Sequence, residues 1–444
     1  MANISPCTSG QNDYPTLRIC NNRKRLDRRS YTAHTCVLLV AALWSSLCAA
    51  AEPQGCAPVE MAMQKVEAVR GLRATGPIPC ELAARSDIER FLKETIARKL
   101  PPEKLKMEGI VYRGIGIVPD SYPYEERLVA LYVTEIGGYY DPEKKRFVMA
   151  SWLPATSQAP VARHELAHAL QDQHYNLEAF LDPTIENGDE LLARASLVEG
   201  DATAVMVDVE QREAKTYPRL SGADAAEKFS EGGELLSALR TQLQKTPPGL
   251  TYLMRFPYRQ GERFVRFLIG RGGYGAVNQA FSRPPRASRE ILHPEEYVAG
   301  GFSPSIPPIE CLQGEDPHGP QAAYTDTLGE SGIEAALRSL RVDAKSRERA
   351  VRGWVGDRIG VFPKEGNQRR LVWVLRWETD IDAAEFLGAY RSGLENHYGK
   401  ALRAGANDLS ASKSIDMTIR PRETRLIFSI QEPAIPSTNT ASLR

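Results

Sequence analysis

The pattern HELAH at residues 164–168 constrains this chain more than any other feature of its sequence. On an α-helix, residues four positions apart lie on one face, about 6 Å from each other, so His164 and His168 can direct ring nitrogens at a single ion. Glu165 projects at a different angle, where it can reach a water molecule on the metal without binding the metal itself. The pattern therefore predicts a helix that carries two metal ligands and one general base.

A catalytic zinc ion needs a third protein ligand and keeps one position open for water. Glu199, in the segment LVEGDAT, is the candidate third ligand, and Gly200 beside it would allow another helix to come close. Glu190 and Asp201 are rival candidates for this ligand. However, Glu190 lies at the start of the same predicted helix, and Asp201 points about 200° away from Glu199. His174 is off the face of His164 by about 80° and is expected to form a structural hydrogen bond. The sequence contains no Cys-x-x-Cys pair, so the predicted ligands are nitrogen and oxygen atoms.

The motif HELAHALQDQHY, the preceding GGYYDPEKKRFVM and the following LVEGDAT resemble the gluzincin group of zinc peptidases. Within that group, the chain most resembles a poorly characterised family of bacterial secreted proteins, over most of residues 110–300. The resemblance implies a zincin-like fold, a Zn²⁺ ion held by His164, His168 and Glu199, and Glu165 as the base. Its implied activity is hydrolysis of peptide bonds in a peptide or protein substrate by metal-activated water.

The sequence leaves two features of the expected site undecided. Thermolysin-like gluzincins place an Asp four residues after the ligand Glu, whereas this chain has Thr203; Asp208 is an alternative partner for a ligand histidine. The oxyanion of the transition state also needs a hydrogen-bond donor, and His293, Tyr258 and Tyr140 are the polar candidates. A structural loop histidine and packed tyrosines are the competing interpretations of these three residues.

Apolar periodicity predicts an α+β fold, with a first domain over residues 52–310 that the resemblance implies to be zincin-like. A hairpin is expected at residues 139–149, and its edge would either bind an extended peptide or be purely structural. Short strands are expected at residues 109–112, 115–118 and 131–133. The predicted helices cover residues 59–73, 81–100, 159–175, 189–211, 223–245, 261–269 and 274–281.

A segment rich in Pro and Gly at residues 303–321 predicts a linker, followed by a smaller α+β accessory domain over residues 315–444. Its expected helices cover residues 332–340 and 381–398, and its expected strands cover residues 371–377 and 424–430. An alternative hypothesis makes this domain the functional module, with its tryptophans as contact residues for cell-wall or protein partners. These are Trp354, Trp373 and Trp377, although their alternation with aliphatic residues favours a core position.

A basic stretch followed by the apolar residues 36–51 predicts a secretory leader over residues 1–51, cleaved before Glu52. The expected location is secreted or periplasmic, with an uncleaved membrane anchor as the alternative. The apolar run is shorter than the ~20 residues of a membrane-spanning helix, so no stable span is expected in the mature chain. An oxidising compartment favours a Cys56–Cys80 disulfide, with Cys311 free or paired elsewhere.

The overall charge is balanced, with 56 basic and 56 acidic residues, so no global field favours nucleic acid as a partner. The composition is typical of a folded globular protein, at 42% apolar and 25% charged residues. A catalytically silent zinc-binding or interaction protein on the same scaffold is the alternative to an active peptidase. The intact Glu165 favours activity, because a silent protein needs no base at that position. The oligomeric state does not follow from the sequence.

Overall fold

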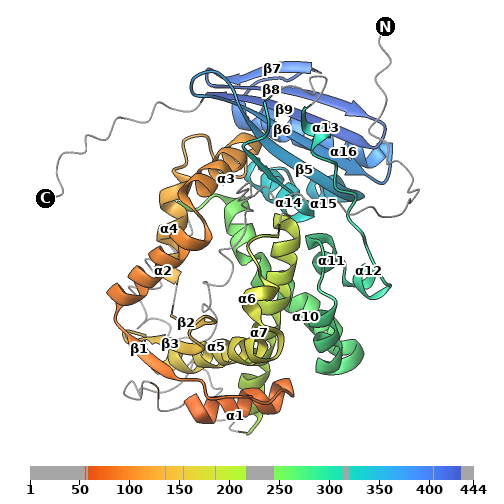
Figure 1. Ribbon diagram of the computed structural model, residues 1–444. Coiled ribbons are helices and arrows are strands. Elements are labelled where there is room, and N and C mark those ends of the chain that lie inside the picture. Colours follow the sequence, from red (N-terminus) through yellow and green to blue (C-terminus); the bar gives the residue numbers. More distant parts are fainter. Residues whose placement is uncertain are drawn as a thin grey trace, which may run out of the picture.

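A computed structural model describes residues 56, 59–135, 137–153, 155–185, 187–216, 245–313, 320–403 and 405–431. The predicted leader and residues 223–244 of the helix predicted at residues 223–245 lie outside the described residues. The described part is a mixed α+β protein with two sheets. Figure 1 shows a mostly helical lobe, formed by elements between residues 59 and 298, beneath a larger sheet formed by the C-terminal part.

The helical lobe contains most of the helices and the smaller of the two sheets. Its elements are α1 (Val59–Arg70), β1 (Cys80–Ala83), α2 (Arg85–Lys99), α3 (Pro102–Ile115), α4 (Tyr124–Glu135), β2 (Gly138–Asp141), β3 (Arg146–Ala150), α5 (Ala155–Tyr175), α6 (Leu177–Phe180), α7 (Gly188–Thr216), α10 (Pro248–Ser282), α11 (Ser288–Leu292) and α12 (Pro294–Val298). The two helices predicted at residues 261–269 and 274–281 both lie within α10, where Gly272 and Gly273 interrupt the helical backbone.

The smaller sheet has the order β1-β3-β2, with β2 and β3 antiparallel and β1 parallel to β3. The hairpin predicted at residues 139–149 is confirmed, and α5 packs against both of its strands. The predicted Cys56–Cys80 disulfide is also confirmed, and it ties the start of α1 to β1. Cys311 is not free. The N-terminal segment is thus fastened to the sheet that supports the HELAH helix.

The strands predicted at residues 109–112, 115–118 and 131–133 are wrong. The first lies in α3, the second includes the end of α3 and the turn after it, and the third lies in α4. Almost every residue from Glu108 to Val118 is buried, so apolar side chains occur on all sides of this helix end. A short continuous apolar run of this kind has no periodicity that separates a buried helix from a buried strand.

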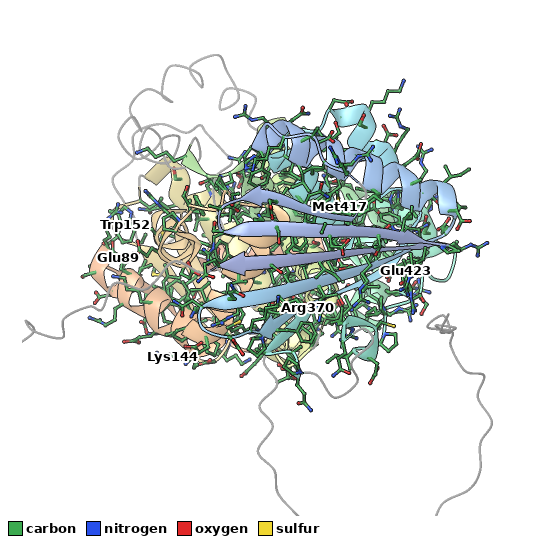
Figure 2. All side chains as sticks on the ribbon, turned by 90° about the horizontal axis from the view of Figure 1, so that it is seen from above. Glu89, Lys144, Trp152, Arg370, Met417 and Glu423 are labelled. Carbon is green, nitrogen blue, oxygen red and sulfur yellow. A yellow bond between two sulfur atoms is a disulfide. The ribbon has the colours of Figure 1, made fainter. Side chains whose placement is uncertain are left out.

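The C-terminal part forms a six-stranded sheet of order β4-β5-β6-β9-β8-β7, with every neighbouring pair antiparallel. Figure 2 looks down on this sheet, whose strands run side by side across the molecule. The elements are α13 (Glu310–Gln313), β4 (Tyr324–Asp326), α14 (Gly329–Ser339), α15 (Ala344–Val351), β5 (Trp354–Pro363), β6 (Gln368–Trp377), α16 (Asp380–Tyr398), β7 (Gly405–Ser410), β8 (Lys413–Arg420) and β9 (Glu423–Gln431).

Both predicted helices and both predicted strands of the C-terminal part are confirmed, as α14, α16, β6 and β9. The inner face of the sheet packs on α16, with Trp373 and Trp377 against Phe386. Trp354, Trp373 and Trp377 are at most 2% exposed. The hypothesis that these tryptophans contact a partner is therefore wrong, because they fill the core.

The largest apolar cluster includes buried residues of both the helical lobe and the C-terminal part. The end of α3 is hydrogen-bonded to two helices of the C-terminal part. The Tyr390 hydroxyl of α16 donates to the Ile115 carbonyl at 2.9 Å, and the Ser339 hydroxyl of α14 donates to the Ile117 carbonyl at 2.6 Å. The first part of the expected linker is packed too, since the Ser305 amide donates to the Val355 carbonyl. No helix within the described ranges is long and apolar enough to cross a membrane.

Candidate metal site

His164 and His168 of α5 face Glu199 of α7 in the interior of the helical lobe. Their three ligand atoms all lie within 4.8 Å of one another. His164 Nε2 is 3.1 Å from Glu199 Oε2 and 3.0 Å from His168 Nε2, and His168 Nε2 is 3.4 Å from Glu199 Oε2. All three residues are at most 4% exposed. The structure thus brings together the three residues that the sequence predicted as ligands.

These separations fit a tetrahedral zinc ion. Zinc bonds of about 2.1 Å at tetrahedral angles place neighbouring ligand atoms about 3.4 Å apart. The three observed separations, 3.0, 3.1 and 3.4 Å, lie close to that value. Two nitrogens and one carboxylate oxygen are also donors that zinc accepts readily. The residues present therefore fit the ion that the sequence implied.

The charges in the group also favour a cation. Although burial opposes ionisation, the charge of His168 and hydrogen bonds to both histidines hold the pKa of Glu199 below its usual value. Burial lowers the pKa of His164, whereas the negative charge of Glu199 raises the pKa of His168 to about 9 against the effect of burial. The negative charge of Glu199 therefore favours a cation between the three ligand atoms.

Glu165 is buried beside the ligand group, on the same helix. The Tyr140 amide of β2 donates to Glu165 Oε2 at 2.8 Å and orients the carboxyl group. In the described part of the chain, Glu165 Oε1 has no hydrogen-bond partner. Burial raises the pKa of Glu165 to about 8. A carboxyl group with one oxygen held and one oxygen unused has the properties of a general base.

Gln171 is a partner of the candidate ligand His168 that the sequence interpretation missed. Its Nε2 donates to the Val198 carbonyl at 3.0 Å and to Asp201 Oδ2 at 2.9 Å, so its Oε1 faces His168 Nδ1 at 2.8 Å. When Gln171 Oε1 accepts a hydrogen bond from Nδ1–H of His168, the Nε2 lone pair of His168 is left for a metal. The available signal was spacing, because Gln171 follows His168 by one helical turn.

The close helix approach predicted at Gly200 is confirmed, and the partner is α10. A Cβ atom on Gly200 would lie 2.2 Å from the Gly261 carbonyl carbon, and one on Gly261 would lie 2.0 Å from the Ser196 oxygen. The two glycines let α7 and α10 cross with their backbones in contact. Glu199 is next to this crossing, so the contact helps to fix its position.

The rival candidates have other partners. Glu190 pairs with Arg194 at 2.6 Å, and His174 contacts the Arg73 carbonyl, in the structural role expected of it. Asp208 pairs with Arg266, so the suggestion that it reaches a ligand histidine is wrong. The supporting carboxylate is Asp201 instead, acting through Gln171 on the second histidine.

The three candidate oxyanion donors differ in their surroundings. The Tyr258 ring lies 6.3 Å from the His164 ring, centroid to centroid, so Tyr258 is beside the site. The Tyr140 hydroxyl donates to Asp172 at 2.8 Å. His293 lies between α11 and α12, where its Nε2 is 2.9 Å from Glu330 of α14. Within the described residues, no hydrogen bond or ion pair joins His293 to the ligand group.

Comparisons with known proteins bear on the C-terminal part alone. Residues 318–426 match a family described as a domain of unknown function (DUF8575). No curated protein and no solved structure matches the chain. The matched stretch runs from just before β4 into β9 and excludes all three ligand residues. The case for a function therefore depends on the geometry of the site.

Proposed function

We propose that this protein is a zinc-dependent peptidase of the gluzincin type, with a zincin-like fold in its helical lobe. One observation carries the proposal: two histidines of the HELAH helix and Glu199 of the following long helix meet at zinc-ligand spacing. The oxygen of Glu165 that lacks a partner in the described part of the chain supports catalysis over a purely structural metal site. The resemblance of HELAHALQDQHY and LVEGDAT to gluzincins supports the same conclusion.

The ion would supply Lewis-acid chemistry, polarising the scissile carbonyl and acidifying a water molecule. The Tyr140 amide holds one oxygen of Glu165, so the other oxygen is aimed to take a proton and to return it to the leaving amine. Gln171 keeps the proton of His168 on Nδ1. Tyr258, beside His164, is the best-placed candidate to donate a hydrogen bond to the developing oxyanion.

Strand β2 is the proposed binding edge for an extended peptide substrate. It pairs with β3 on one side, and its Tyr140 amide points away from β3 toward Glu165. A peptide lying along this edge would run past the proposed base. Main-chain hydrogen bonds at a strand edge give affinity with little dependence on sequence, so we expect broad specificity.

The first experiment measures zinc by elemental analysis in the wild type, Glu199→Ala and Glu190→Ala. Glu190 is on the same helix but pairs with Arg194, so it is the matched control. We expect one zinc per chain in the wild type and in Glu190→Ala, and its loss in Glu199→Ala. A wild type without zinc would contradict the proposal.

The second experiment measures hydrolysis of unfolded, fluorescently labelled casein by the zinc-loaded protein. We expect cleavage that stops with a chelator and returns when zinc is added back. Zinc binding without cleavage of casein or of a mixed peptide library would favour the silent zinc-binding protein instead. The burial of all four site residues is the observation that keeps this second candidate in consideration.

A further inference from the structure

A buried chain of side chains runs from the first helix of the protein to the second histidine. Arg70 is the last residue of α1, and its Nε donates to Asp201 Oδ2 at 2.9 Å. The same Asp201 oxygen accepts from Gln171, and Gln171 accepts from His168. Arg70, Asp201 and Gln171 are each at most 1% exposed. The chain therefore joins α1 to the ligand group without passing through solvent.

Arg70 is held rigidly at the far end of this chain. Its Nη1 donates to Asn278 Oδ1 of α10 at 2.7 Å, and its guanidinium lies over the Tyr274 ring, 5.0 Å from the centroid. Helix α1 packs on both α5 and α7, and the disulfide ties its start to the small sheet. A guanidinium fixed in this way gives Asp201 a defined orientation as well as a compensating charge.

The orientation of Asp201 decides which way the Gln171 amide faces. An amide presents two donors on nitrogen and an acceptor on oxygen. With Asp201 and the Val198 carbonyl both accepting from its nitrogen, Gln171 can offer only oxygen to His168. Without this anchor, the amide can turn and present N–H to Nδ1, which would move the histidine proton to the metal-facing nitrogen.

We infer that Arg70 is a positioning residue of the metal site, which holds His168 in its metal-binding form through Asp201 and Gln171. This inference rests on the proposed function, because it presumes a metal between His164, His168 and Glu199. It makes α1 a part of the metal site. Removing α1 would leave Asp201 buried without its cation.

The test measures the Kd for zinc of the full chain by competition with a chelator of known affinity. Arg70→Met is compared with Arg73→Met, whose arginine is close in sequence but has an 83% exposed side chain. Loss of an outer partner of a metal ligand weakens binding by about 10- to 100-fold, and we expect this for Arg70→Met alone. Equal zinc affinity in Arg70→Met and wild type would overturn the inference.

The visible absorption spectrum of Co²⁺ bound in place of zinc separates positioning from simple structural support. Because Arg70 does not touch the ion, its loss should change this spectrum only by moving His168. Weaker binding with an unchanged spectrum would therefore overturn the positioning role. A wild type that binds neither metal would instead refute the proposed function, which keeps the two failures distinct.

Arg70→Met leaves a buried unpaired carboxylate and can prevent folding. In that case the double variant Arg70→Met/Asp201→Leu is measured instead, since it removes both charges of the buried ion pair. Gln171 remains in this protein but has lost its anchor. We expect the same weaker zinc binding and altered Co²⁺ spectrum from the double variant, and wild-type behaviour would overturn the inference.

Discussion

Two buried carboxyl groups, one in each part of the molecule, have opposite surroundings. Glu165, beside the ligand group, accepts one hydrogen bond, and its second oxygen has no partner in the described part of the chain. Asp357, on β5, accepts four, from the amides of Leu328 and Gly329 and from the indoles of Trp354 and Trp373. Burial raises the pKa of Glu165 to about 8 but that of Asp357 only to about 6, because the donors around Asp357 favour its ionised form.

The difference contrasts a buried carboxylate that stabilises the fold with one that is proposed to act in catalysis. Asp357 fastens the start of α14 to two tryptophans of the core, so every one of its acceptor positions contributes to stability. Glu165 has a partner for only one of its oxygens among the described residues, as the proposed exchange of protons would require. Substitutions that remove each charge but keep the shape test this contrast directly.

The largest expected effect is on hydrolysis. Glu165→Gln removes the proposed base but preserves the contact with the Tyr140 amide, so we expect kcat to fall by about 10²- to 10⁴-fold. Zinc content and the free energy of unfolding should stay near those of the wild type. Casein cleavage, elemental analysis and urea denaturation measure the three quantities. Unchanged kcat with zinc bound would show that Glu165 is not the base.

The matching substitution in the sheet should have the reverse profile. Asp357→Asn turns one acceptor oxygen into an NH₂ group that faces buried N–H donors, so we expect unfolding to become easier by about 3 kcal/mol. Zinc affinity should not change. Asp343→Asn is the control, because asparagine can still cap α15 from that exposed position. An equally stable Asp357→Asn protein would remove the basis of the comparison.

A smaller effect is expected at the helix crossing beside Glu199. Gly200→Ala forces α7 away from the backbone of α10, and overpacking of this kind typically destabilises by about 1–3 kcal/mol. The shift should also weaken zinc binding. Gly270→Ala on α10 is the control, since a Cβ there meets nothing within 4 Å. Thermal unfolding and chelator competition would detect both effects, and equal behaviour of the two variants would refute the tight crossing.

The smallest effect concerns His293, whose hydrogen bond to Glu330 raises the pKa of the imidazole. Because this pKa is raised in the folded state, the protonated imidazole stabilises the fold at pH values below its usual pKa of 6.5. This contribution is lost as the pH rises through the raised pKa. Because the side chain is 47% exposed, solvent screening limits the cost of His293→Gln to about 0.5 kcal/mol at low pH.

Urea denaturation of His293→Gln on both sides of this titration measures the stability effect, with Glu330→Gln as the matched variant. Casein cleavage by His293→Gln at neutral pH should be unchanged. A large fall in kcat would instead support the catalytic role that the sequence suggested for His293.

The sequence predicted the three candidate ligands that the structure brings together. Helical spacing alone relates His164, Glu165 and His168, and Glu199 lies in a strongly periodic segment. Turn residues likewise marked the hairpin at residues 139–149. In contrast, apolar runs buried on all sides, such as the end of α3, were mistaken for strands because burial removes the periodicity that identifies a helix.

The sequence by itself determined that His164 and His168 lie on one face of a helix, since the spacing of residues on a helix follows from helix geometry. Only the tertiary structure decided which residues support them. Arg70, Asp201 and Gln171 come from three helices and meet only when α1, α7 and α5 pack together. Hydrogen bonds act over about 3 Å, and the sequence does not record which distant side chains folding brings within that range.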